Sequence, residues 1–238
     1  MVFTPPAPVP PSAFETWGRL IGGQPQGFQQ NPAGMPPGSN ASGLLGVYQA
    51  NIGVQLGRID ITLQPQVDGA PPSHPPTIVD KDAAIQTLVG LGQKLAIGDN
   101  PIRVAFIINC AINASSEAEA VAIFKGATNL SHIPSTASDL NFALNVRRGL
   151  GAAGWQMNRF VRWGLGQVQF VQFQVVSSGS QFPQTLNAHH LATMAIDINS
   201  VPRNIPLGPT QAADAIASLA AEAKLIMSQG YDRLSSAN

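Results

Sequence analysis

Four arginines and two tryptophans lie close together in the middle of the chain, in a segment without acidic residues. They are Arg147, Arg148, Trp155, Arg159, Arg162 and Trp163. No Asp or Glu occurs between Asp139 and Asp197. A guanidinium group binds a carboxylate or phosphate through two parallel hydrogen bonds, and an indole ring stacks on planar or cationic groups. This composition predicts a binding site for a small anionic or planar ligand.

A second interpretation gives the same residues a structural role. The arginines would then pair with acids brought from elsewhere in the chain, such as Asp80, Asp82, Asp139 or Glu119. The tryptophans would lie in the core or in an interface. Either arrangement depends on which residues meet in three dimensions, so the sequence leaves both interpretations open.

Two other patterns suggest chemistry and are weaker. The run Gly149-Leu-Gly-Ala-Ala-Gly154 matches the G-x-G-x-x-G fingerprint of dinucleotide-binding loops. However, the preceding strand alternates polar and apolar residues, and no acidic residue follows about 20 positions later to bind a ribose. His189 and Asp197 would lie about 26 Å apart on one regular strand, too far for a catalytic pair. We therefore expect no catalytic residues, no metal site and no cofactor.

The charge of the chain limits its partners. The 238 residues have a formal net charge of zero and only 11% are charged, against about a quarter in ordinary globular proteins. A low net charge gives little attraction to nucleic acid and little repulsion between copies. The composition argues against sequence-specific nucleic-acid binding and favours a homo-oligomer or a larger multi-subunit assembly.

Cysteine usage and hydropathy indicate the environment. The single cysteine, Cys110, excludes an internal disulfide and a zinc site built from cysteines. No signal-peptide pattern and no run of about 18 apolar residues is present. These features predict a soluble, cytoplasmic protein that does not contact a membrane.

The first 43 residues differ in composition from the rest. Residues 1–43 contain nine of the 20 prolines, together with many Gly and Gln residues. Such a segment buries too little apolar area to offset the entropy of ordering it, so we expect an irregular N-terminal arm. One short helix is expected within it, at about residues 13–21, because Ser12 and Glu15 have the spacing of a capping box.

Residues 44–238 have the pattern of a single α+β domain. The most strand-like segment is Ile102–Cys110, which is apolar on one face and in the middle of the other. Further strands are expected at 139–147, 167–176 and 188–198, and helices at about 80–96, 116–126 and 210–229.

Two strand-like segments change the phase of their alternation. The change at Gly57, within residues 44–64, predicts a two-residue hairpin with Gly first or one long strand with a glycine bulge, and the change near Phe170 predicts a β-bulge. A shift of one residue would otherwise turn every apolar side chain to the wrong face.

Together these elements predict an α+β fold. An antiparallel or mixed sheet of about five to six strands would be covered by two or three helices and preceded by the Pro/Gly-rich arm. We expect a non-enzymatic structural or interaction protein that self-associates, as a subunit of a larger assembly. The alternative is a ligand-binding domain or enzyme that holds an anionic or planar ligand at residues 147–163.

Overall fold

The computed structural model describes residues 1–5, 10–67, 74–134, 136–150, 155–175, 181–202 and 205–235. The strands are β1 (Val2–Phe3), β2 (Gly27–Gln30), β3 (Gly38–Leu45), β4 (Tyr48–Gln55), β5 (Arg58–Pro65), β6 (Arg103–Ala114), β7 (Asn141–Leu150), β8 (Trp155–Val175) and β9 (Gln181–Ser200). The helices are α1 (Ala13–Leu20), α2 (Lys81–Asp99), α3 (Glu117–Thr128), α4 (Pro209–Gln229) and α5 (Tyr231–Ser235).

The strands form one antiparallel sheet in the order β2-β3-β4-β5-β1-β6-β9-β8-β7. The prediction of five to six strands and two or three helices is therefore wrong, because the described residues contain nine strands and five helices. The α+β class itself is compatible with this sheet and its helices.

Three strands were not predicted, and β1, β2 and most of β3 lie in residues 1–43, which the composition marked as irregular. The core-facing positions of β3 hold the small residues Ser39, Ala41 and Gly43. A Cβ at Gly43 would lie 3.1 Å from the indole ring of Trp17 on α1. Small residues therefore let α1 approach the sheet closely, and they remove the apolar alternation by which a strand is recognised in a sequence.

The N-termini of the helices agree with the sequence patterns better than the number of strands does. Ser12 accepts a hydrogen bond from the Glu15 amide at 3.1 Å, and Glu15 accepts one from the Ser12 amide at 3.0 Å, as expected for a capping box. At α3, Ser116 accepts from the Glu119 amide at 3.2 Å, but the Glu119 carboxylate accepts from Ser115 instead. Ser116 and Glu119 also have the spacing of a capping box, but only the half made by Ser116 is formed.

The two-residue strand β1 joins the two halves of the sheet. Val2 and Phe3 pair with Ile59 and Arg58 of β5 on one side. On the other side they pair with Val104 and Arg103 of β6. In the described residues β5 and β6 are separated by β1, so strand pairing joins the two halves of the sheet only through β1.

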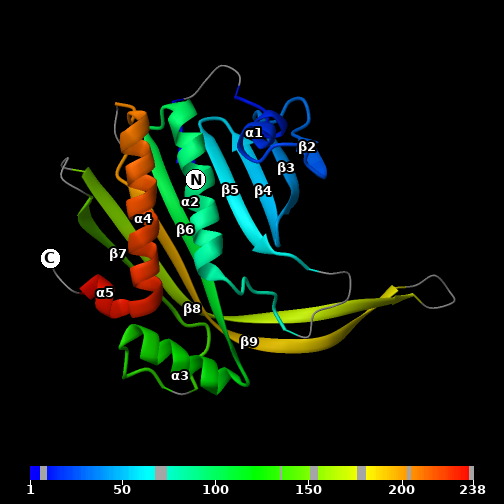
Figure 1. The fold of residues 1–238 in the computed structure, drawn as a ribbon. Helices are drawn as coiled ribbons and strands as arrows, with labels where there is room; N and C mark the ends of the chain where they lie inside the picture. The colour runs from blue at the N-terminus through cyan, green and yellow to red at the C-terminus, as the bar shows by residue number, and fades with distance from the viewer. Residues whose placement is uncertain are drawn as a thin grey trace.

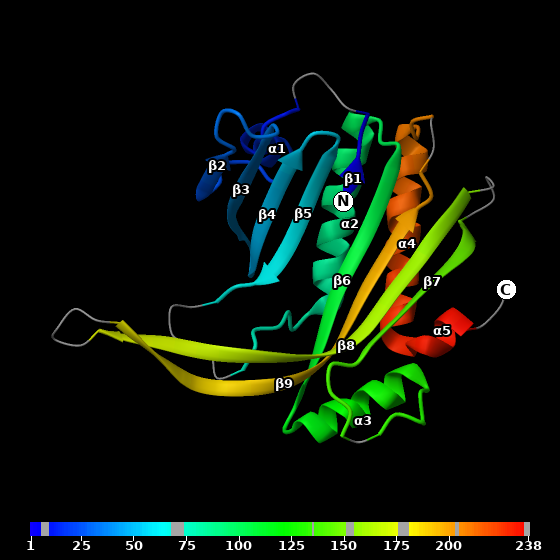
Figure 2. The same ribbon diagram turned by 180° about the vertical axis from the view of Figure 1, so that it is seen from behind.

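The helices lie on one face of the sheet (Figures 1 and 2). Helices α2 and α4 pack side by side across its middle, and α1 covers β3 and β4. Helix α3 lies where β8 and β9 leave the sheet, and α5 follows α4 at the same end of the molecule. The opposite face, which we call the open face, carries exposed polar residues such as Asn109, Asn141 and Arg162. The apolar core fills the space between the sheet and the helices.

Strands β8 and β9 continue beyond the sheet as a two-stranded ribbon (Figures 1 and 2). Pairing of β8 with β7 ends at Gly164, and pairing of β9 with β6 ends at His190. From there β8 and β9 pair only with each other, as far as Val175 and Gln181. The register shifts between Phe170 and Val171, which confirms the predicted β-bulge.

The other phase change is a two-residue hairpin, but its turn residues are Leu56 and Gly57, so the glycine is second and not first as predicted. Gln55 of β4 pairs with Arg58 of β5, and Gly57 in the turn between them has a φ of +71°, a conformation that favours glycine. The glycine-rich run at 149–154 begins inside β7, where Gly149 pairs with Gln156 of β8. Residues 151–154 lie outside the described residues, and the element after them is β8 rather than the helix that a dinucleotide fingerprint requires.

Candidate functional site

Strand alternation divides the predicted arginine and tryptophan residues between the two faces of the sheet. Arg148 is paired with Met157, and Arg159 with Val146 and Ile198, so both arginines lie on the face that the helices cover. Arg147 and Arg162 occupy the alternate positions and lie exposed on the open face. The four arginines therefore do not converge on one site.

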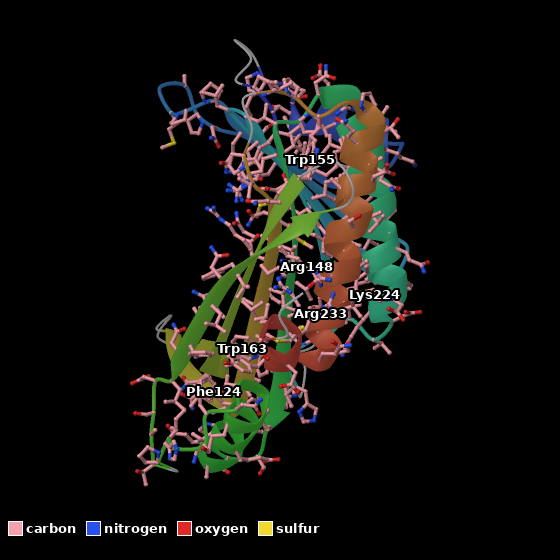
Figure 3. The ribbon with its side chains drawn as sticks, turned by 90° about the vertical axis from the view of Figure 1, so that its left-hand side faces the viewer. Phe124, Arg148, Trp155, Trp163, Lys224 and Arg233 are labelled. Atoms are coloured by element: carbon pink, nitrogen blue, oxygen red, sulfur yellow. The ribbon has the colours of Figure 1, made fainter. Side chains whose placement is uncertain are left out.

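The two arginines on the helix side meet at a buried glutamate. Glu222 of α4 accepts hydrogen bonds from Arg159 Nη1 at 3.1 Å and from Arg233 Nη2 at 2.7 Å. Arg148 Nη1 lies 3.4 Å from the same carboxylate. Figure 3 shows Arg148 and Arg233 approaching this region from β7 and α5. We call these four residues the Glu222 cluster.

The electrostatics of the Glu222 cluster keep its carboxylate ionised. Burial alone would raise the pKa of Glu222, but hydrogen bonds from Arg233 and Arg159 and the charges of Arg233 and Arg148 outweigh it. The pKa of Glu222 is therefore lowered from its ordinary value of 4.5.

The donors of Arg159 are used inside the protein. Its side chain is 4% exposed, Nη1 also donates to the Arg233 carbonyl at 3.3 Å, and Nε donates to the Val146 carbonyl at 3.5 Å. This geometry holds α4 and α5 against the sheet. The acids that the sequence suggested as partners for these arginines were Asp80, Asp82, Asp139 and Glu119, and Glu222 was not among them.

A pattern in the sequence does point to Glu222. It lies three positions after Leu219 and four before Ile226, and both of these are buried on the core-facing side of α4. An acidic residue on such an apolar stripe must find a cationic partner in the core. Arg148 and Arg159, at core-facing positions of their strands, supply this cationic partner.

On the open face Arg147 contacts a neutral amide, whereas Arg162 lines a groove that also contains Asp139, one of the acids suggested by the sequence. Arg147 Nε donates to Asn158 Oδ1 at 3.2 Å, and Asn158 Nδ2 donates to Asn199 Oδ1 at 3.0 Å. Arg162 lines a shallow groove of about 510 Å³ with Asn109, Asn141 and Thr193 among its other walls. The groove is open to solvent and does not enclose a pocket.

The tryptophans belong to the core rather than to the arginine groups. Trp155 is half-buried beside the core at the start of β8. Trp163 is 1% exposed, and its ring stacks on Phe142 with centroids 5.7 Å apart. Of the six predicted residues, Arg148 and Arg159 meet at the carboxylate of Glu222.

Other reactive groups are dispersed. Among the residues that the structure describes, no three His, Cys, Asp or Glu side chains are grouped so as to hold a metal ion. Burial raises the pKa of the Cys110 thiol, so it is protonated at neutral pH. None of the described helices is long and apolar enough to cross a membrane.

The chain has no recognisable relative in three comparisons with known proteins. No family model matches it, and neither the curated proteins nor the solved structures contain a significant match. Function must therefore be argued from the geometry of this molecule.

Proposed function

We propose that this protein is a non-enzymatic structural subunit that self-associates through the β8–β9 ribbon. The observation that carries the proposal is the extension of β8 and β9 beyond every other strand (Figure 2). An isolated two-stranded hairpin is marginally stable in water at best. A ribbon of this length gains stability when its edges or faces pack against another surface.

The composition of the ribbon supports the same function. No charged residue occurs between Arg162 and Asp197, a segment that includes the whole ribbon. Exposed strand edges in monomeric proteins usually carry charges, which oppose pairing with other chains. The ribbon lacks this protection, as expected for a segment that pairs with a partner.

We propose the β2 edge of a second copy as the surface that receives the ribbon. The other charge-free segment of comparable length runs from Arg19 to Arg58 and includes β2, β3 and β4. Phe14 and Phe28 lie exposed at this edge with their rings 5.8 Å apart. The opposite edge strand, β7, carries Arg147 and Arg148, which makes it the poorer acceptor.

A ribbon-to-edge contact joins two different surfaces of the same chain. Such a contact is heterologous, so repeating it produces a closed ring or an open filament. Backbone hydrogen bonds along the β2 edge would supply affinity in the manner of strand addition.

The test is the molar mass of the full chain in solution, measured by light scattering after size-exclusion chromatography over a range of concentrations. Wild type should form a concentration-dependent oligomer that persists in high salt, because the proposed contact contains no charged residue. Gln169→Lys places a charge on an exposed position of the ribbon and should weaken association by about tenfold or more.

The matched control is Gln86→Lys, the same substitution at an exposed position of α2. It should leave the molar mass unchanged. A wild type that remains monomeric at all concentrations, or equal association by Gln169→Lys and wild type, would contradict the proposal.

A further inference from the structure

The groove of about 510 Å³ lies on the open face, where β6, β9, β8 and β7 are neighbours in the sheet (Figure 2). The strand register explains its shape. Ala195 of β9 lies between Asn109 of β6 and Arg162 of β8. Two residues further along β8, Gly164 pairs with Asn141 of β7. Small residues therefore form the floor of the groove, and longer polar side chains border it.

The polar side chains of the groove are exposed and are not used inside the protein. Arg162 and Asp139 both line it, and neither forms an ion pair or a side-chain hydrogen bond within the part of the chain that the structure describes. The same is true there of the side-chain amides of Asn109 and Asn141. A ligand in the groove can reach all four groups without moving another side chain.

The two charges of the groove lie toward opposite ends. Among the described residues that line it, only Arg162 and Asp139 are charged. Arg162 pairs with Ala143 of β7, whereas Asp139 lies four positions before Ala143, ahead of the first residue of β7. Four positions along a strand correspond to about 13 Å. The groove thus presents a positive group and a negative group that do not neutralise each other by direct contact.

A ligand that is complementary to this arrangement carries an anionic group at one end and a cationic group at the other. A guanidinium group binds a carboxylate through two parallel hydrogen bonds, and a carboxylate accepts hydrogen bonds from an ammonium group. Side-chain amides both donate and accept, so Asn109 and Asn141 match the N–H and C=O groups of a peptide. An extended chain of about four residues spans about 13 Å, and the long side chain of Arg162 shortens the requirement to about three.

We propose that this groove binds a short peptide with free termini, whose carboxylate contacts Arg162 and whose ammonium group contacts Asp139. The described lining reaches Leu165 on β8 and Thr193 on β9, so it ends where the ribbon begins. The proposal therefore does not rest on self-association through the ribbon.

Three forms of triglycine separate the contributions of the two charges. Triglycine has both free termini, acetyl-triglycine keeps only the carboxylate, and triglycine amide keeps only the ammonium group. Binding to the full chain is measured by saturation-transfer NMR, which observes the peptide protons and also works for large assemblies. Triglycine should bind saturably, with a dissociation constant of about 1 mM at the efficiency of ordinary small ligands. Each blocked peptide should bind about tenfold more weakly, because one charge-assisted contact is lost.

Two substitutions at exposed positions assign the ends of the peptide. Arg162→Gln should weaken binding of triglycine and acetyl-triglycine by about tenfold and change binding of triglycine amide by less than about twofold. Asp139→Asn should weaken triglycine and triglycine amide and leave acetyl-triglycine unchanged. Asn also tolerates the left-handed backbone of this position, where φ is +55°. The control is Arg147→Gln, which removes a charge from the same face outside the described lining of the groove and should change none of the three affinities.

The comparison of the three peptides on wild type decides the question even without the variants. No saturable binding of triglycine at about 10 mM, or equal binding of the three peptides, would overturn the proposal. Among the variants, an effect of Arg162→Gln without an effect of Asp139→Asn would show a site for anions alone and would also contradict it. Circular dichroism confirms that each variant is folded.

Discussion

Arg159 of β8 and Glu222 of α4 form an ion pair inside the protein, with Nη1 and Oε1 3.1 Å apart and side chains 4% and 6% exposed. This pair connects the helix layer to the sheet. Arg148 and Arg233 approach the same carboxylate from β7 and α5, so four elements meet at one acidic group.

Removing the carboxylate should therefore be strongly destabilising. Glu222→Ala leaves the buried guanidinium of Arg159 without its counter-ion, and we expect the free energy of unfolding to fall by about 3–5 kcal/mol. Urea denaturation followed by circular dichroism measures this loss. The control is Lys224→Ala, which breaks the exposed Lys224–Asp82 pair from the same helix and should cost less than about 1 kcal/mol. Equal losses in the two variants would contradict the structural role of the Glu222 cluster.

The same carboxylate should contribute to acid sensitivity. Because the pKa of Glu222 is lower in the folded protein than its ordinary value of 4.5, the unfolded chain binds the proton more tightly. The stabilisation is present above about pH 4.5 and is lost as the pH falls through the lowered pKa. Denaturation midpoints measured between pH 7 and pH 3 should fall less steeply in Glu222→Gln than in wild type. Parallel curves would argue against a lowered pKa at this position.

The strand β1 should determine how firmly the two halves of the sheet are joined. Val2 is 1% exposed between β5 and β6, and Val2→Ala should lower stability by about 1–2 kcal/mol through lost burial and a small void. Hydrogen exchange should also accelerate at the amides of Thr4 and Ile102, which bond across this junction. Val79→Ala, at a valine 94% exposed, is the control and should change neither quantity.

Cys110 should react slowly with alkylating reagents. Burial raises the pKa of its thiol, and only the thiolate is nucleophilic. We expect the rate constant with iodoacetamide at pH 7.5 to be at least about tenfold lower in the folded protein than in urea. Because the chain has a single cysteine, mass spectrometry reports this reaction without ambiguity. A folded-state rate equal to the rate in urea would show that the thiol is open to solvent.

The proposed receiving edge has its own variant. Gln29 is an exposed residue of β2, and Gln29→Lys should weaken association about as much as Gln169→Lys does on the ribbon. An equimolar mixture of the two variants should recover partial association, because each still carries one intact surface. If only the ribbon variant changes the molar mass, then the ribbon binds elsewhere.

The larger helices and the strong strands were predictable from the sequence because their side-chain patterns are unambiguous. Asp80 caps α2 through a 2.9 Å bond to the Ala83 amide, and the bulge at Phe170 lies where the alternation changes phase. The strand count was not predictable, because β1 has only two residues and because β2 and β3 consist largely of Gly, Ser, Asn, Ala and Gln residues that carry no apolar alternation. Their stability comes from α1 and from neighbouring strands.

The candidate site shows a different limit of sequence analysis. Proximity in sequence grouped Arg147 with Arg148, whereas strand alternation separates them onto opposite faces. Glu222 lies 63 positions from Arg159, and only the packing of α4 on the sheet brings them together. The helix pattern of α4 indicates that Glu222 is buried, but the arginines that pair with it can be identified only when the order of the strands is known.

The position of β1 in the sheet has a consequence for synthesis of the protein. Met1 donates a hydrogen bond to the Ala105 carbonyl, 104 positions later in the chain. At about 5–20 residues per second, the ribosome takes about 5–20 s to add the residues that separate these partners. Until β6 emerges, the nascent chain exposes an unpaired strand edge beside β5. The number of residues between β1 and β6 therefore sets how long this edge could pair with other chains during synthesis.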